Sequence, residues 1–112
     1  MAMSLVFNGE EIATDKQGYL LDHTLWQDAL GATMAKNDHF ELTEAHWEVI
    51  KFVRQFYLTY NTSPAIRALT KAMKAEFGEE KASSRYLFKL FPDGPAKQAT
   101  KYAGLPKPKR CL

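Results

Sequence analysis

The chain has 112 residues, of which 46% are hydrophobic and 12% aromatic, and its 15 Lys and Arg against 13 Asp and Glu leave a net charge of +2. This length and composition predict one folded domain over residues 1–112 with a modest core, and they exclude a disordered chain. No apolar run approaches the ~20 residues that a membrane span needs.

A β-hairpin is predicted at the N-terminal end, over residues 5–13. The segments Leu5-Val6-Phe7 and Glu11-Ile12-Ala13 flank Asn8-Gly9, a dipeptide that tolerates the positive φ of a tight type I′ turn. Because a two-stranded ribbon is only marginally stable alone, we expect it to pack on helices. A helical body follows over residues 24–102, and its first helix is expected from about Thr24 to Lys36.

The second helix has the strongest periodic pattern and is predicted to be the central one. Thr43 is a plausible N-cap, and Glu44 would lie near the positive end of the helix dipole. Next to Trp47, His46 is expected to pack or to cap rather than to act as a base. A stripe predicted to be buried recurs at helical spacing in Val49, Phe52, Val53, Phe56 and Tyr60.

Two further helices resemble a helix-turn-helix pair. Ser63 is expected to cap the first of them, with Pro64 at its first helical position, and Gly78 is expected to end it. The second would start near Ser83 or Ser84, which places Arg85 where such motifs touch DNA bases. A DNA-binding regulator is therefore one alternative function, although the acidic turn between the two helices disfavours contact with phosphates.

A last short helix is predicted from about Pro95 to Tyr102, and residues 103–112 are expected to form a flexible, projecting arm. Pro106 and Pro108 each remove a backbone donor and fix φ, so the segment cannot be a helix interior. Gly104, Pro106 and Pro108 are therefore predicted to position an extended, polyproline-like arm.

The chain's only cysteine, Cys111, is the next-to-last residue of this arm. A thiol there is unsuited to filling a core but can be inserted into a pocket of another protein, and its thiolate can carry a persulfide. One cysteine cannot form an internal disulfide, and no secretion signal precedes Phe7, so a reducing, cytoplasmic setting is expected. No metal-ligand spacing or cofactor motif is present.

The two halves of the chain differ in charge. Residues 1–62 carry a net charge of −5 and residues 63–112 a net charge of +7. A basic C-terminal half indicates an acidic partner, which a protein or a nucleic acid could provide. Lys107, Lys109, Arg110 and Arg85 are the candidate partner-binding residues, with an ordinary solvated surface as the alternative.

The tail resembles that of the DsrC/TusE family, because Gly104-Leu105-Pro106-Lys107-Pro108 precedes a next-to-last cysteine. The resemblance extends over nearly the whole chain from Leu5 onward and is specific as a combination of motifs. Its other segments, in family order, are His46-Trp47, Asn61-Thr62-Ser63-Pro64-Ala65-Ile66-Arg67, Ser84-Arg85-Tyr86-Leu87 and Gly94-Pro95-Ala96-Lys97-Gln98-Ala99.

The resemblance distinguishes two branches of the family. Family members that act with dissimilatory sulfite reductase carry a second cysteine eleven residues before the terminal one, where this chain has Thr100. This departure favours the single-cysteine, TusE-like branch, which implies a sulfur relay for 2-thiolation of the wobble uridine of tRNA. The implied partners are a TusBCD-type donor, through its TusD subunit, and an MnmA-type thiouridylase with tRNA.

The sequence therefore predicts a mainly α protein of α+β composition, a small helical bundle with an N-terminal hairpin, a helix-turn-helix-like pair and a C-terminal arm. Its predicted function is that of a sulfurtransferase component with Cys111 as the persulfide carrier, without cofactor or metal and away from membranes. The alternatives are a DsrC-type, gamma subunit-like partner of dissimilatory sulfite reductase and the DNA-binding regulator.

Overall fold

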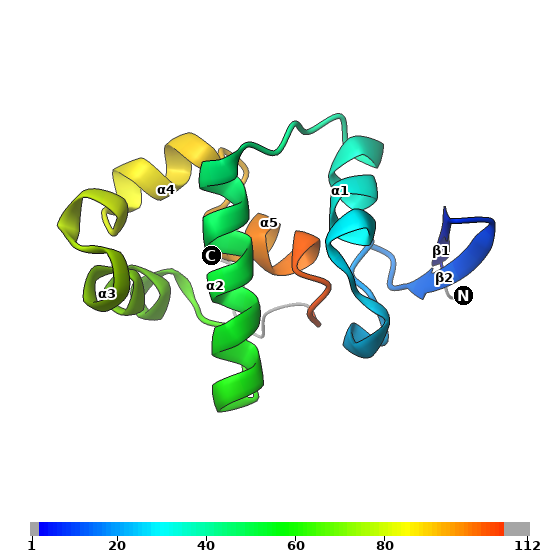
Figure 1. Ribbon diagram of the computed structural model, residues 1–112, viewed down its shortest axis with the longest axis horizontal. Helices are drawn as coiled ribbons and strands as arrows, with labels where there is room; N and C mark the ends of the chain where they lie inside the picture. The colour runs from blue at the N-terminus through cyan, green and yellow to red at the C-terminus, as the bar shows by residue number, and fades with distance from the viewer. Residues whose placement is uncertain (1–2, 107–112) are drawn as a thin grey trace.

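A computed structural model describes residues 3–106 and places five α-helices after a two-stranded antiparallel hairpin. The predicted mainly helical fold is thereby confirmed. In Figure 1, α2 stands near the middle of the molecule, with α3 and α4 on one side and α1 and the hairpin on the other. The elements are β1 (Met3–Phe7), β2 (Glu10–Thr14), the 3-10 helix η1 (His23–Leu25), α1 (Asp28–Asn37), α2 (Glu44–Tyr60), α3 (Ile66–Phe77), the 3-10 helix η2 (Glu79–Lys81), α4 (Ser84–Leu90) and α5 (Pro95–Tyr102).

The hairpin forms around the predicted turn. Asn8 and Gly9 both have positive φ, 52° and 80°, as a type I′ turn requires. The strands pair in register from Met3 with Thr14 to Phe7 with Glu10, so they extend slightly beyond the predicted limits. Side chains alternate along β2, where Ile12 and Thr14 are buried, and the hairpin contacts α1 through β1.

The start of α2 is fixed by His46, as predicted for a packing or capping residue. The backbone N–H of Thr43 donates to Nδ1 of His46 at 3.0 Å, so Nε2 carries the ring proton and donates to the carbonyl of Leu90 at 2.7 Å. The ring also lies edge-on to Phe40 and Phe91. One side chain therefore caps α2 and ties it to the end of α4.

The predicted stripe on α2 is correct for its first half only. Val49 and Val53 are fully buried, whereas Phe52 and Phe56 are half-buried and Tyr60 is 64% exposed. The prediction of a buried Tyr60 was wrong because the last turns of α2 extend beyond the neighbouring helices (Figure 1).

Two predicted helix starts also differ from the structure. The expected helix from Thr24 is divided into η1 and α1, because the chain is extended at Trp26 and Gln27. Ala65, not Ser63, is the N-cap of α3, and Pro64 is buried before the helix begins, where it contributes to packing.

The most deeply buried helix is α5. Leu69 and Met73 of α3, Leu87 of α4 and Val49 of α2 belong to the same core cluster as Ala99 of α5. The end of α5, which leads to the C-terminal residues, is therefore held in the centre of the fold. Its buried residues are Pro95, Ala96, Gln98, Ala99, Thr100 and Tyr102.

Candidate functional site

The predicted sulfur carrier Cys111 lies outside the described residues, as do Lys107, Pro108, Lys109 and Arg110. What the structure does describe is the segment from Ala103 to Pro106, from which these residues follow. The geometry of this segment determines where the chain leaves the folded domain.

The expectation that the arm begins at residue 103 needs correction. Ala103 and Leu105 are fully buried, Gly104 is buried between them, and Pro106 is the first exposed residue. The physical reason is that Leu105 is an apolar anchor, which belongs to the hydrophobic core cluster. The chain therefore passes from the core to the surface within one residue.

A Schellman motif ends α5 at this point. The N–H of Leu105 donates to the carbonyl of Thr100 at 3.2 Å, and the N–H of Gly104 donates to the carbonyl of Lys101 at 3.0 Å. Gly104 has a φ of +70°, the left-handed conformation that this motif needs at its C′ position. The two bonds satisfy carbonyls at the helix end and fix the direction of the chain.

Trp26 and Arg54 hold the same segment from outside the helix. The indole N–H of Trp26 donates to the carbonyl of Tyr102 at 2.8 Å, and a Cβ at Gly104 would fall on the Trp26 side chain. Nη1 of Arg54 donates to the carbonyl of Ala103 at 2.9 Å. The Arg54 guanidinium also lies over the Trp26 ring, 4.5 Å from its centroid. We call Trp26 and Arg54 the root clamp.

The root clamp also fixes η1. Nη2 of Arg54 donates to the carbonyl of His23 at 3.1 Å, and the His23 ring lies edge-on to Tyr57 of α2 at 5.1 Å. Burial lowers the pKa of the Arg54 guanidinium, and the carbonyls of His23 and Ala103 are the partners that stabilise its charge. One guanidinium thus joins α2, η1 and the end of α5.

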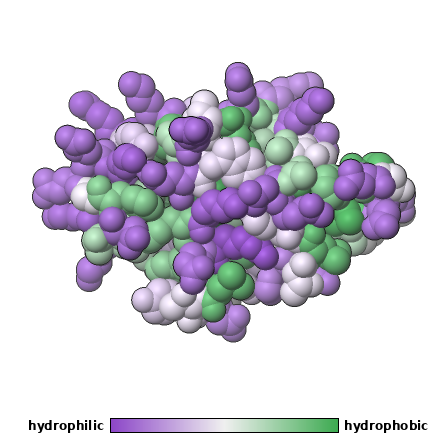
Figure 2. All heavy atoms as spheres, in the orientation of Figure 1, coloured by the Kyte–Doolittle hydropathy of each residue, from purple (hydrophilic) through white to green (hydrophobic). Residues whose placement is uncertain are grey.

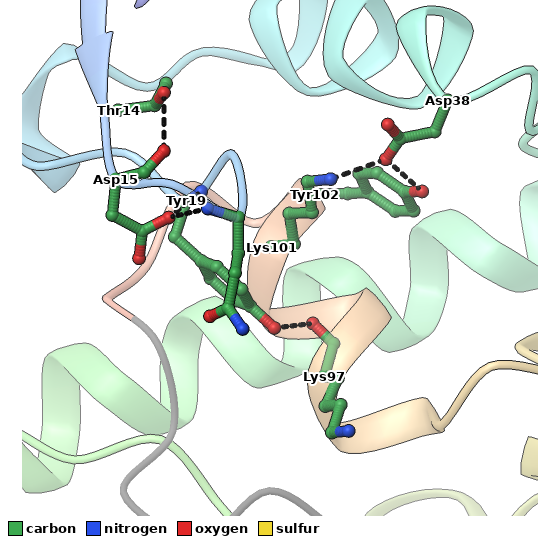
Figure 3. Close-up of polar contacts among 8 residues, drawn as sticks. Thr14, Asp15, Tyr19, Asp38, Lys97, Lys101 and Tyr102 are labelled. Atoms are coloured by element: carbon green, nitrogen blue, oxygen red, sulfur yellow. Dashed lines mark hydrogen bonds and ion pairs between the residues drawn. The ribbon is translucent and has the colours of Figure 1, made fainter. Parts of the chain in front are cut away.

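The N-terminal half also contacts α5 through Asp38, as Figure 3 shows. Its carboxylate accepts from Nζ of Lys101 at 2.7 Å and from the hydroxyl of Tyr102 at 2.9 Å, while the hydroxyl of Tyr19 donates to the carbonyl of Lys97 at 3.2 Å. Burial, together with the hydrogen bond to Asp38, raises the pKa of Tyr102 well above its ordinary value. A cleft of about 320 Å³ lies beside these groups.

Thr100 occupies the position at which the two-cysteine branch would carry its second thiol. Its side chain is fully buried, and its hydroxyl has no hydrogen-bond partner in the part of the chain that the structure describes. A threonine here can neither form a disulfide nor carry sulfur. Residue 100 therefore contributes packing to the root of the arm.

Arg85, the remaining predicted partner-binding residue, lies on the exposed face of α4. It forms no hydrogen bond or ion pair within residues 3–106, and α4 is on the other side of α2 from α1 (Figure 1). In the turn of the helix-turn-helix-like pair, Glu79 is paired with Lys74 at 3.3 Å. The structure thus does not bring Arg85 together with Gly104 and Pro106.

Residues 3–106 include no helix long and apolar enough to cross a membrane. Over the same residues, no cluster of His, Asp and Glu side chains has the arrangement of a metal site.

Comparison with known proteins decides the family. A model of DsrC-like proteins matches residues 6–112. The chain belongs to the DsrC-like family. Its relatives include the sulfurtransferase TusE of Sodalis glossinidius, 63% identical over 106 residues that cover 95% of this chain and 98% of that protein. The sulfurtransferase TusE of Pectobacterium atrosepticum is 62% identical over 108 residues, 96% of this chain and 99% of the relative.

Solved structures of DsrC-like proteins have the same fold. The NMR structure of Allochromatium vinosum DsrC matches with a TM-score of 0.90 and 47% identity over the whole of both chains. The crystal structure of the oxidized gamma-subunit of dissimilatory sulfite reductase (DsrC) from Archaeoglobus fulgidus matches with a TM-score of 0.84 and 36% identity, covering 98% of this chain and all of that one. The family resemblance predicted from the sequence is confirmed.

Sequence reasoning did not identify the contacts of Trp26 and Arg54 with the end of α5. Neither has a motif of its own, and their partners are the backbone carbonyls of Tyr102 and Ala103, more than forty residues further along the chain. The sequence offered only weak signals for these contacts: Trp26 lies just before a helix, and Arg54 lies on the polar side of the central helix.

Proposed function

We propose that this DsrC-like protein is a sulfur carrier that accepts a persulfide on Cys111 and passes the sulfur on for 2-thiolation of the wobble uridine of tRNA. The observation that carries the proposal is the placement of the only cysteine next to the C-terminus, after a rigid root, in a chain 61–63% identical to sulfurtransferases named TusE. The role is that of a covalent intermediate between two proteins.

Each transfer is a thiol exchange at a sulfane sulfur. The Cys111 thiolate attacks the outer sulfur of a donor cysteine persulfide, an S–S bond forms to Cys111, and the S–S bond of the donor breaks. The donor leaves as a thiolate, and the transferred sulfur keeps its proton, so Cys111 becomes Cys-S-SH without a net oxidant or reductant. An acceptor thiolate then repeats the attack on the outer sulfur of Cys111.

Because this chemistry needs few catalytic groups, the folded domain contributes placement. The Schellman motif and the root clamp fix where Pro106 leaves the core, and a fixed root lowers the entropy that is lost when the arm enters a partner. Pro106 and Pro108 would stiffen the segment between the root and the thiol.

We assign the two partners on the same basis. The donor is a TusBCD-type complex acting through a TusD subunit, and the acceptor is an MnmA-type thiouridylase with bound tRNA, both in the cytoplasm. Lys107, Lys109 and Arg110 would meet acidic groups of the partners or tRNA phosphates, with Arg85 as a separate contact on α4. Charge reversal at the three tail cations should slow transfer and weaken its salt dependence, and an unchanged rate with unchanged salt dependence would contradict their role.

The decisive experiment is the intact mass of the protein after incubation with glutathione persulfide. The unchanged protein should gain one sulfur atom, which a reductant removes, whereas Cys111→Ser should gain none while keeping its circular dichroism spectrum and melting temperature. Ser84→Ala, an exposed change on α4, serves as the control and should load fully. Sulfur on the Cys111→Ser variant would overturn the proposal.

The DsrC-type alternative, partnership with a dissimilatory sulfite reductase, is disfavoured by Thr100. Without a second thiol, Cys111 cannot close an intramolecular disulfide or take part in a trisulfide. Co-purification of the chain with such a reductase, together with loss of sulfur transfer to the thiouridylase, would favour that alternative.

A further inference from the structure

Three leucines stand exposed around the root of the arm. Leu21 is 58% exposed, Leu25 49% and Leu58 56%, a large exposure for side chains of this size. We propose that these three residues, the leucine rim, form the surface on which the protein that donates sulfur to Cys111 docks. This inference rests on the proposed function and names the docking face that the function requires.

Leu21 and Leu25 are placed near the end of α5 by the contacts of the root clamp. Leu25 directly precedes Trp26, whose indole N–H holds the carbonyl of Tyr102. Leu21 and Leu25 lie two residues on either side of His23, whose carbonyl is bound by the same guanidinium that binds the carbonyl of Ala103. Both leucines are therefore beside the segment that ends at Pro106.

Leu58 joins this group through helix geometry. Lys51 and Arg54 both lie over the Trp26 ring, at 5.6 Å and 4.5 Å, and Leu58 follows them at i+7 and i+4 on the same face of α2. Figure 1 shows the segment before α1 beside the end of α5, on the α1 side of α2, and Figure 2 shows hydrophobic atoms scattered among hydrophilic ones over this face of the molecule.

The length of the remaining chain restricts where a partner can bind. Cys111 is the fifth residue after Pro106. Even when fully extended, a chain of five steps spans only about 18 Å, so the cysteine that exchanges sulfur must come within about that distance of Pro106. Leu25 directly precedes Trp26, which contacts the root, whereas Phe88, another exposed apolar side chain, is on α4, on the other side of α2 from α1.

The chemistry of the rim fits a protein and not a nucleic acid. Its side chains are aliphatic, and Lys51, which lies over the Trp26 ring, is already paired with Asp28 at 2.6 Å. Arg54 is likewise occupied by backbone carbonyls. An aliphatic surface with its cations paired offers apolar burial to a protein partner and little attraction to phosphate.

The test separates loading by a small molecule from transfer between proteins. Leu25→Glu, Leu58→Glu and the double variant are compared with Phe88→Glu and Val6→Glu, which change exposed apolar residues elsewhere. All variants should load from glutathione persulfide at the rate of the unchanged protein. Transfer from a persulfidated TusBCD-type donor should fall about tenfold for each rim variant and remain unchanged for the two controls.

The experiment distinguishes an incorrect docking proposal from an incorrect sulfur-carrier proposal. If the unchanged protein does not load, the proposed function is wrong; if it loads and the rim variants accept sulfur from the donor as well as the controls do, the rim proposal is overturned. A loss of transfer in Phe88→Glu alone would place the docking face on α4 and would also overturn it.

The same variants test whether something other than the sulfur donor covers the leucine rim. If a second copy of the chain covers it, sedimentation should show a dimer that Leu58→Glu dissociates without slowing transfer. If residues 107–112 cover it, alkylation of Cys111 should be faster in Leu58→Glu, again with transfer unchanged. Either result would contradict docking of a sulfur-exchanging partner at this surface.

Discussion

Two helices of this protein end on a glycine with positive φ, and the two ends have different surroundings. Gly78, with a φ of +90°, follows α3 at the surface, and a Cβ added there would meet nothing within 4 Å. Gly104, with a φ of +70°, follows α5 in the core, where a Cβ would collide with the Trp26 side chain. The same residue type thus makes an open turn in one place and a packed anchor in the other.

The comparison shows how the fold separates a peripheral pair of helices from the part that carries the arm. Leu69 and Met73 are the buried residues of α3, whereas most of α5 is enclosed and its end is held by the root clamp. Changes at the end of α5 should therefore cost more stability than equivalent changes at the end of α3 or the start of α4.

Alanine substitution at Gly104 and Gly78 should give the largest difference in stability between the two helix ends. Gly104→Ala should lower the free energy of unfolding by about 4 kcal/mol, because backbone strain adds to a clash with Trp26. Gly78→Ala carries backbone strain alone and should cost about 2 kcal/mol. Urea denaturation measures both, and equal losses would show that the two ends are equivalent.

Replacement of Arg54, the cation of the root clamp, should have the next largest effect on the free energy of unfolding. Arg54→Ala should cost about 2 kcal/mol, since the carbonyls of His23 and Ala103 lose charge-assisted hydrogen bonds. Lys51→Ala is the matched control, because Lys51 lies over the same Trp26 ring and its ion pair with Asp28 is exposed, so its cost should stay below about 1 kcal/mol. Arg54→Lys should not restore stability, because one ammonium group lacks the fork that spans two carbonyls.

The stability of the α5 end should also depend on pH at the alkaline limit. The pKa of Tyr102 is raised in the folded state, so its contribution is complete below the ordinary value near ~10 and is lost as pH rises above it, at up to about 1.4 kcal/mol per pH unit. Tyr102→Phe should remove this part of the alkaline slope and cost about 1 kcal/mol at neutral pH through the lost bond to Asp38. Tyr60→Phe, at an exposed ring, should leave the slope unchanged.

The smallest effect is expected at the start of α4. The Ser83 hydroxyl accepts from the backbone N–H of Tyr86 at 3.1 Å, so Ser83→Ala should cost about 1 kcal/mol. Ser84→Ala, which removes a neighbouring exposed hydroxyl without a cap, should change stability by less than about 0.5 kcal/mol. Neither variant should alter sulfur transfer, and a slower transfer in Ser83→Ala would link α4 to the arm.

Much of the fold follows from local signals in the sequence. The Asn8-Gly9 turn, the Thr43 cap and the last helix from Pro95 to Tyr102 were all predicted from residue types that allow few alternatives. Tyr60 was misplaced because periodicity gives the direction of a helix face and not how far its neighbours reach.

The candidate site was only partly accessible from the sequence. Cys111 is evident as a lone cysteine at the end of the chain, and its role remains a prediction. The burial of Leu105 and the contacts of Trp26 and Arg54 with backbone carbonyls depend on residues that are distant in the chain. A hydrogen bond to a carbonyl leaves no trace in the identity of the accepting residue, so single-sequence reasoning cannot find it.

The abrupt change from a buried Leu105 to an exposed Pro106 has a kinetic consequence. If Cys111 carries the sulfur, as proposed, each transfer has to take place within about 18 Å of Pro106. Donor and acceptor would then compete for the same region of the protein, and turnover is expected to follow a ping-pong order in which an excess of either protein inhibits binding of the other.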